Sequence, residues 1–409
     1  MRHFGQLDEG TRHRLFLHQP QQFRRDSAPA QLAVALGATL YSPAIRPRLA
    51  DDVRRQAARG VTSMVLCLED AVEDAEVPAA ERNLVAQLRA LASDGAERRR
   101  WERGSSERRR SERDGELPLL FVRVRGPEQI ADLAARMGGE ALALLSGFVV
   151  PKFTEESGLP FLEALAELRA ASGLPMYAMP VLESPRLAYL ESRAETLLGV
   201  ARLLEKYREL VLAVRLGVTD LCSAYGLRRP PDLTAYDVQL VAAVIGDVVN
   251  VLGRADGTGH VLTGPVWEYF PVQERKFKPQ LRQSPFEESE PPAGQVRRRL
   301  IDHGLDGLIR ELELDRANGL LGKTCIHPSH VPAVHAMSVA THEEWSDARD
   351  ILSEDRAGGG VVRSAYVNKM NEVKPHRAWA QRVTTRAAAF GVAREDVSFA
   401  DLLAACVGG

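Results

Sequence analysis

The chain has 409 residues, of which 45% are hydrophobic and 26% are charged, a composition typical of a globular protein with a large core. Its formal net charge of −2 argues against nucleic acid or a membrane surface as a partner. The N-terminal segment lacks the apolar core of a signal peptide, and no run of about 18 apolar residues occurs. The four cysteines form no CxxC pair, and Cys67 and Cys325 lie in apolar runs. We therefore expect buried, reduced thiols and a cytoplasmic protein.

Residues 1–34 are polar and predict an N-terminal arm. Beyond them, short apolar runs alternate with amphipathic stretches of helical periodicity, such as 79–91. Eight runs have the length and composition of strands: 35–43, 61–70, 117–125, 143–152, 174–183, 210–217, 259–266 and 321–328. This alternation is typical of βα units around a parallel sheet, and eight units favour a closed (β/α)8 barrel over an open sheet. No GxGxxG motif follows the first run to indicate a dinucleotide-binding fold. We predict an α/β protein with a (β/α)8 TIM barrel over residues 35–340.

Two segments interrupt the predicted barrel. Residues 94–116 contain two ERRR blocks and no apolar face, which indicates a solvated insert. Its arginines could contact RNA, but Trp101 is its only aromatic residue for base stacking, so we favour a solvated loop. Residues 276–295 are rich in proline and polar side chains and predict an irregular insert. Residues 341–409 predict a C-terminal helical extension.

Charged residues gather at the predicted carboxyl ends of the strands, the face on which barrel enzymes place their active sites. They are Arg46, Glu69, Asp70, Arg123, Arg125, Lys152, Glu183, Arg215, Asp220, Lys323 and His327. One or two such charges could simply solvate the rim of the barrel. Burying so many in one mouth is costly unless they pair or hold ions, so the pattern indicates catalysis. We interpret His327 as a core histidine and not as a base.

Two acids stand at the ends of neighbouring predicted strands, Glu183 after 174–183 and Asp220 after 210–217. Neighbouring strands lie about 4.8 Å apart, so two carboxylates there can share one cation. Each acid alone could equally form a salt bridge or a helix cap. Because only oxygen ligands are at hand, the pair predicts Mg²⁺, with Mn²⁺ as a substitute.

Arginines alternate in the run FVRVR, where Arg123 and Arg125 are two residues apart. In a strand this spacing places both side chains on one face, which we predict to be the barrel interior. Guanidinium groups bind carboxylate or phosphate in bidentate fashion. An ion-pair network with the acids is the alternative interpretation.

An ordered set of motifs resembles those of the citrate lyase beta-subunit and malyl-CoA lyase superfamily. The motifs are YSPAIRP (41–47), LCLEDAV (66–72), FVRVR (121–125), VVPK (149–152), VLES (181–184), LGVTDL (216–221), GLLGKTCIHPSHV (319–331) and VNKMNEVKPHRAWAQRV (367–383). The resemblance covers most of residues 38–385 and breaks at the two inserts. It implies a (β/α)8 lyase that forms homo-oligomers, often trimers or hexamers, in which a neighbour's C-terminal segment completes the site.

The resemblance also implies roles for individual residues. Glu183 and Asp220 would bind Mg²⁺, helped through water by Glu69 or Asp70. One of these acids, or an ordered water, would pass the proton. Arg123 would polarise the carbonyl or enolate oxygen. Arg46 and Lys152 would contact the substrate or its phosphate. Apart from the resemblance, we also expect Arg125, Arg215 and Gly217 to contact the substrate. The reaction would be a retro-aldol or Claisen-type cleavage of a β-hydroxy acid or its coenzyme A thioester.

The sequence departs from the family at two cations. Arg125 stands where the family usually has asparagine, and Arg215 stands where an aromatic residue is common. Two extra cations suggest a substrate with more negative charge than malate or citrate. Two other functions stay open: a thioester hydrolase using the same site, and a non-catalytic scaffold that binds a protein or RNA through the arginine-rich insert.

Overall fold

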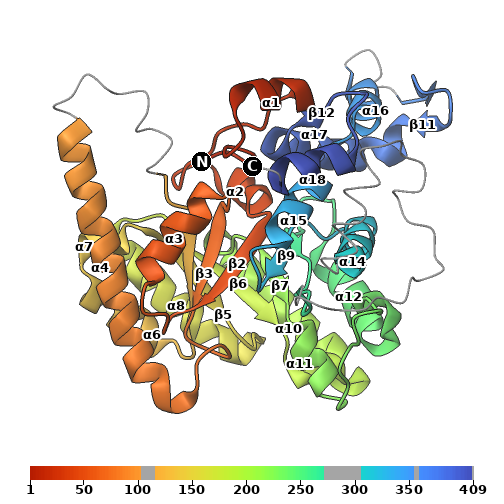
Figure 1. Ribbon diagram of the computed structural model, residues 1–409. Coiled ribbons are helices and arrows are strands. Elements are labelled where there is room, and N and C mark those ends of the chain that lie inside the picture. Colours follow the sequence, from red (N-terminus) through yellow and green to blue (C-terminus); the bar gives the residue numbers. More distant parts are fainter. Residues whose placement is uncertain (103–115, 271–304, 354–358, 408–409) are drawn as a thin grey trace.

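The computed structural model of the protein describes residues 1–102, 116–270, 305–353 and 359–407 (Figure 1). Eight parallel strands form one sheet in the order β8-β7-β6-β5-β4-β3-β2-β9. The strands are β2 (Ala38–Pro43), β3 (Ser63–Cys67), β4 (Leu119–Arg123), β5 (Leu145–Val150), β6 (Tyr177–Leu182), β7 (Val214–Leu216), β8 (Leu262–Thr263) and β9 (Lys323–Cys325). A parallel bridge between Gly264 and Lys323 joins the last two strands and closes the barrel. The predicted (β/α)8 barrel is confirmed, with every strand inside its predicted run.

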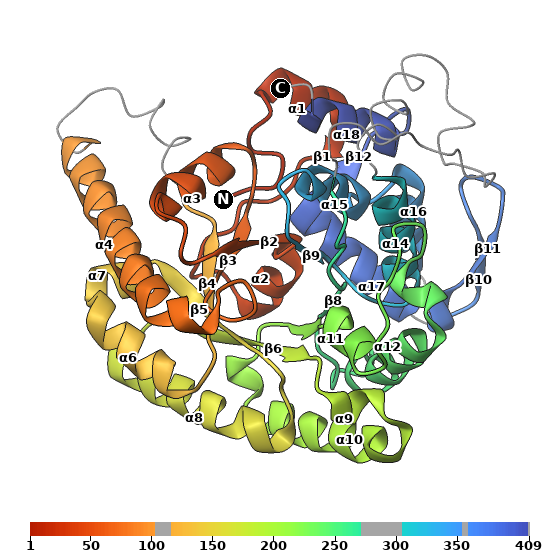
Figure 2. The ribbon, with the colours of Figure 1, turned by 60° about the horizontal axis from the view of Figure 1, so that its bottom comes forward.

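Helices surround the strands on the outside of the barrel (Figure 2). They are α3 (Leu49–Ala58), α4 (Val77–Glu102), α6 (Glu128–Met137), α7 (Gly139–Leu142), α8 (Glu155–Ser172), α10 (Leu190–Lys206), α12 (Gln239–Leu252), α14 (Asp306–Ala317) and α15 (His330–Ser338). Local sequence sets their ends. In α8, Thr154 and Ser157 form a reciprocal capping box at the start, and Gly173 ends the helix in a left-handed conformation with φ of 69°.

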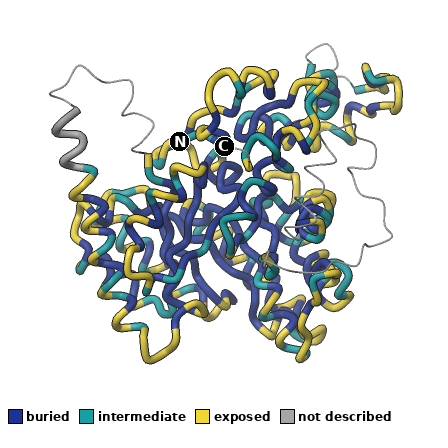
Figure 3. Tube along the Cα trace, viewed as in Figure 1, coloured by how far each residue is buried: buried dark blue, intermediate teal, exposed yellow. Residues whose placement is uncertain are grey.

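The strands are buried on both faces, as Figure 3 shows for the dark core of the molecule. All six residues of β5 are buried, which is typical of parallel strands covered by helices. Gly147 of β5 permits a close approach, because a Cβ there would lie 1.8 Å from the carbonyl oxygen of Tyr177. This two-sided burial explains why the strands are continuous apolar runs in the sequence.

The N-terminal arm closes one end of the barrel. Helix α2 (Pro29–Ala35) and the preceding Phe23 pack in one cluster with interior residues such as Val65 and Phe121. The arm therefore has a buried side of its own, which its polar composition did not reveal. Since α2 precedes the first barrel strand, it lies at the amino ends of the strands, opposite to their carboxyl ends.

The C-terminal extension contains helices α16 (His342–Leu352), α17 (Val373–Phe390) and α18 (Phe399–Val407) and a hairpin of β10 (Val361–Arg363) and β11 (Met370–Glu372). Strand β12 (Val392–Ala393) pairs with β1 (Phe16–His18) in the N-terminal arm. Both chain ends thus lie on the side of the molecule where α2 lies (Figure 1).

The predicted inserts differ in outcome. Helix α4 continues through Glu102, so residues 94–102 extend a helix where a loop was expected. Residues 103–115 and the whole predicted insert 276–295 lie outside the described residues.

The predicted buried thiols Cys67 and Cys325 are confirmed as free and buried. None of the described helices has the length and apolarity needed to cross a membrane.

Candidate active site

Six of the predicted residues come together at the carboxyl ends of the strands. Glu69 and Asp70 follow β3, Arg123 is the last residue of β4, Lys152 follows β5, Glu183 follows β6, and Asp220 lies in α11 (Val218–Ser223) after β7. This cluster, hereafter the carboxylate cluster, faces away from α2. Asp220 is close enough to act electrostatically on both Glu183 and Lys152.

Arg123 is the centre of the carboxylate cluster. Its Nη2 lies 2.7 Å from Glu69 Oε2, 3.0 Å from Asp70 Oδ2 and 2.9 Å from Glu183 Oε1. Burial alone would lower the pKa of Arg123, but Glu183 and the other nearby groups raise it above its ordinary value. The guanidinium therefore holds three acids from the ends of two other strands, β3 and β6, and stays charged.

Lys152 links two carboxylates through different atoms. Its Nζ donates to Glu69 Oε1 at 2.7 Å, and its backbone N–H donates to Glu183 Oε1 at 3.0 Å. The backbone at Lys152 has φ of 48°, an uncommon conformation for a residue with a side chain. Such strain often occurs at functional sites, where the surrounding contacts enforce it.

The crowding of acids shifts their pKa values. Burial, and then the neighbouring Asp220 against the opposing effect of Arg123, raises the pKa of Glu183 to about 7. Burial and a side-chain hydrogen bond with Glu69 raise the pKa of Asp70 to about 6. The same hydrogen bond, with Arg123 and Lys152, outweighs burial and lowers the pKa of Glu69. Burial is thus the first cause of both raised pKa values, and the neighbouring carboxylates add to it.

Glu183 is held against the backbone of the next strand end. A Cβ on Gly217 would lie 2.2 Å from Glu183 Oε2 and 2.4 Å from its Cβ, so only glycine leaves room for this side chain. Glu183 is 2% exposed. Gly217, which we predicted as a substrate contact, thus has a packing role that the sequence did not indicate.

A hydrated divalent cation fits the acids that the structure brings together. Within the described part of the chain, no three His, Cys, Asp or Glu side chains are arranged as a complete metal-binding group. Mg²⁺ does not require one, because it usually keeps several waters and binds one or two carboxylates. Asp220 raises the pKa of Glu183 through repulsion between the two carboxylates, and a cation bound between them would offset this repulsion. These two residues could therefore hold such an ion.

Arg125 does not point into the barrel, and the predicted direction of its side chain is wrong. Strand β4 ends at Arg123, so the alternation of a strand does not extend to Arg125. Its guanidinium donates to the carbonyl oxygens of Leu68 at 2.8 Å and Val72 at 2.6 Å and pairs with Asp74. Arg125 therefore fixes the loop that carries the two acids after β3.

Other predicted cations also lie apart from the carboxylate cluster. Arg46 is exposed and pairs with Asp52 at 2.5 Å. The side chain of Lys323 in β9 points out of the barrel toward α14, where its fully buried Nζ is 2.8 Å from Glu311 and 2.6 Å from Asp315. Both residues form structural ion pairs.

His327, interpreted as a core histidine, is half-buried. It stacks on Phe270, with ring centroids 4.9 Å apart, and its Nδ1 lies 2.7 Å from Ser329 Oγ. Burial lowers its pKa below the ordinary value. The imidazole therefore stays neutral near pH 7, which does not favour it as a charged substrate contact.

Arg215 lies inside the barrel, beneath the carboxylate cluster, and is 1% exposed. Its Nη2 donates to Thr324 Oγ1 at 2.9 Å, and its guanidinium carbon lies 5.6 Å from the ring centre of Tyr41. Sequence reasoning missed Tyr41, although its inward position two residues after Thr39 in β2 could have marked it.

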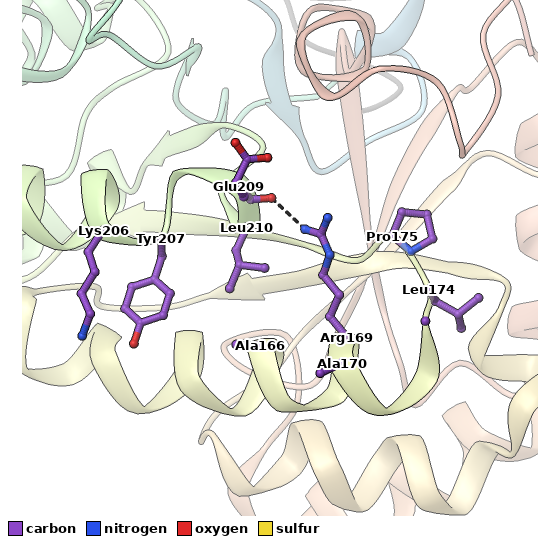
Figure 4. Close-up of a pocket in the computed structure, with 10 residues that line it drawn as sticks. Ala166, Arg169, Ala170, Leu174, Pro175, Lys206, Tyr207, Glu209 and Leu210 are labelled. Carbon is purple, nitrogen blue, oxygen red and sulfur yellow. Dashed lines mark hydrogen bonds between the residues drawn. The ribbon is translucent and has the colours of Figure 1, made fainter.

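A hollow of about 630 Å³ lies elsewhere on the molecule, between the end of α8 and the segment before β7 (Figure 4). It is lined by residues such as Arg169, Pro175 and Tyr207. Because Pro175 precedes β6 and Tyr207 precedes β7, the hollow lies at the amino ends of the strands. It is therefore remote from the carboxylate cluster.

Solved structures with the same barrel include two related to citrate lyase. The CitE protein from Mycobacterium tuberculosis in complex with magnesium, acetoacetate and coenzyme A is 20% identical, with a TM-score of 0.50 over 87% of this chain and 99% of that chain. A citrate lyase from Burkholderia xenovorans LB400 is 17% identical, with a TM-score of 0.56 over 90% and 96%. At these identities the likeness shows a shared fold.

No match was found among curated proteins. Residues 30–392 match the family described as C-C_Bond_Lyase of the TIM-Barrel fold, which is most of the chain. The ordered motifs, the closed barrel and the charged cluster at its carboxyl end agree with that match. The chain therefore belongs to the carbon–carbon bond lyase family of the TIM-barrel fold, as the resemblance in its motifs predicted.

Proposed function

We propose that the protein is a Mg²⁺-dependent lyase that cleaves a β-hydroxy acid, or the coenzyme A thioester of one, through an enolate. One observation carries this proposal: Arg123 forms ion pairs with three acids at the carboxyl ends of the strands, and Asp220 lies near them. Magnesium and coenzyme A are both present in the CitE complex, whose fold this chain shares. A bound Mg²⁺ would supply positive charge that polarises the substrate carbonyl.

The chain's own residues have distinct parts in the proposed reaction. Glu183 and Asp220 would hold the ion, and Arg123 donates to the oxygen that gains charge as the carbon–carbon bond breaks. Asp70 is half exposed, and its pKa is raised to about 6, close to the value that suits a base at neutral pH. It takes the proton of the β-hydroxyl group; that oxygen becomes a carbonyl, and the electron pair of the broken bond forms the enolate. Lys152 orients Glu69 and Glu183.

Calorimetric titration with Mg²⁺ and oxalate, an enolate mimic, tests this proposal without knowledge of the substrate. We expect oxalate binding that requires Mg²⁺ in the wild type and is lost in Glu183→Gln. Glu163→Gln, the same change on the exposed face of α8, is the matched control and should bind as the wild type does. Well-folded wild-type protein that shows no Mg²⁺-dependent oxalate binding would overturn the proposal.

Finer features are inferred with this function. We infer a cytoplasmic homo-oligomer, a trimer or hexamer, whose domains are the arm 1–34, the barrel 35–340 and the extension 341–409. Sedimentation of the purified protein tests the oligomeric state.

Release of free thiol from a thioester without a carbonyl product would favour the alternative function of a thioester hydrolase. Salt-dependent RNA or protein binding that is lost on deletion of residues 97–113, with the site acids dispensable, would favour the scaffold.

A further inference from the structure

Arg215 is a buried cation without an acidic partner. Its Nη1 is 3.3 Å from Thr39 Oγ1 and 3.6 Å from Met179 Sδ, its Nη2 donates to Thr324, and its Nε has no partner. Among the described residues, no carboxylate lies within 4.0 Å of this guanidinium. Arg215 thus makes contacts only with neutral groups.

Several other buried cations in the described ranges are paired with acids. Arg123 contacts three carboxylates, Arg229 pairs with Glu311, and Lys323 pairs with Glu311 and Asp315. A buried charge costs several kcal/mol unless it is paired, so an unpaired guanidinium is not explained by stability. Its position inside the barrel, below the open end, suggests that its partner is a ligand.

Tyr41 lies between Arg215 and the carboxylate cluster. Its ring is beside the Arg215 guanidinium, and the groups that act on its hydroxyl electrostatically include Arg123 and Glu183. Tyr41 is half-buried, and Arg215 is almost fully buried. No hydrogen bond to its hydroxyl is formed within the described part of the chain. Burial raises the pKa of Tyr41 despite the opposing effect of Arg215, so the hydroxyl keeps its proton and can donate.

Once a divalent cation is bound, the carboxylate cluster has no net negative charge left to balance Arg215. The cluster has four acids (Glu69, Asp70, Glu183 and Asp220) and two cations (Arg123 and Lys152), a formal charge of −2. One divalent cation neutralises it. The charge of Arg215 then remains at the floor of the site, with the free hydroxyl of Tyr41 above it.

We propose that Tyr41 and Arg215 form a floor subsite that selects a substrate with a second carboxylate. Tyr41 donates a hydrogen bond to this carboxylate, and Arg215 is a positioning residue that supplies the compensating charge from beneath the ring. Arg125 has no part in this selection, because the loop after β3 uses its guanidinium. The inference rests on the proposed function, since the first carboxylate and the carbonyl must be held at the metal pair.

Two hydroxy acids of nearly equal shape test the subsite. Malate and 2-hydroxybutanoate differ in that a methyl group replaces the second carboxylate. We would titrate each into the Mg²⁺-loaded full chain at the same free Mg²⁺, with oxalate as the reference ligand. In the wild type we expect malate to bind about tenfold more tightly than 2-hydroxybutanoate, the scale of one hydrogen bond to a charged group.

Two variants separate the hydroxyl from the charge. Tyr41→Phe keeps the ring on Arg215 and should reduce the preference for malate to about twofold or less, while oxalate still binds. Arg215→Met should do the same, and Arg215→Lys should keep part of the preference. If Arg215→Met does not fold, Tyr41→Phe and Arg215→Lys decide the question.

The outcomes separate this inference from the proposed function. Oxalate binding by the wild type without a preference for malate would overturn the floor subsite alone. A preference that persists unchanged in Tyr41→Phe and in the Arg215 variants would also overturn it. Absence of Mg²⁺-dependent oxalate binding in the wild type would overturn the proposed function and the subsite together.

Discussion

Replacing Gly217 with alanine should damage the candidate metal site without unfolding the barrel. The added Cβ would lie 2.2 Å from Glu183 Oε2 and 2.4 Å from Glu183 Cβ, whereas ordinary contacts begin at 3.4 Å. Rotation of the carboxylate would relieve the first contact but not the second. The strand end after β6 must therefore move by about 1 Å, and a misplacement of that size can reduce the rate of a reaction by about 100-fold.

The same movement lengthens the contacts of Glu183 with Arg123 and with the backbone of Lys152. We expect Mg²⁺-dependent oxalate binding to weaken by at least about tenfold, as calorimetry would show. Gly246→Ala in α12 is the matched control, because a Cβ there meets nothing within 4 Å, and it should stabilise the helix by about 0.5–1 kcal/mol. Wild-type affinity in folded Gly217→Ala would refute the position, or the ligand role, assigned to Glu183.

Three further predictions concern the residues that shape the carboxylate cluster. Glu183 has its pKa raised from 4.5 to about 7, first by burial, so its native carboxyl binds a proton more tightly than the unfolded one. The metal-free protein should therefore lose stability as the pH rises from 4.5 to about 7, and urea unfolding of Glu183→Gln should show a flatter profile. Arg125→Asn removes the loop contacts and should cost about 1–2 kcal/mol and weaken oxalate binding; unchanged binding and unchanged proteolysis of the loop would contradict this. Lys152→Gly should be about 1 kcal/mol more stable than Lys152→Ala, because φ is 48° there, and equal melting temperatures would argue against backbone strain.

The barrel could be predicted because its strands are buried on both faces, which makes each an unbroken apolar run. Even β8, with only two residues, lies in the apolar stretch 259–266. The role of the N-terminal arm could not be predicted. Phe4, Phe16 and Phe23 are far apart and follow no period, so their burial depends on distant partners in the fold.

The residue types of the candidate site could be predicted better than the directions of their side chains. Acids and cations at strand ends marked the carboxylate cluster, and six of them do come together. The end of β4 at Arg123 decides that Arg125 turns away, and Lys323 faces helix α14 instead of the interior. A difference of one or two residues in a strand end changes which face a side chain occupies. The sequence does not show that difference.

The pairing of β1 with β12 has a consequence for folding. Phe16 is paired with Ala393, and the backbone N–H of Arg394 donates to Leu15, so these contacts join residues more than 370 positions apart. The barrel itself needs β9 beside β2 before it is closed. A chain emerging from the ribosome therefore cannot close the barrel until β9 is available, and it cannot complete the β1–β12 pairing until residue 394 is available. We expect slow, late-stage folding in which the amino-terminal apolar residues stay exposed during synthesis, which makes the nascent chain a natural client for chaperones.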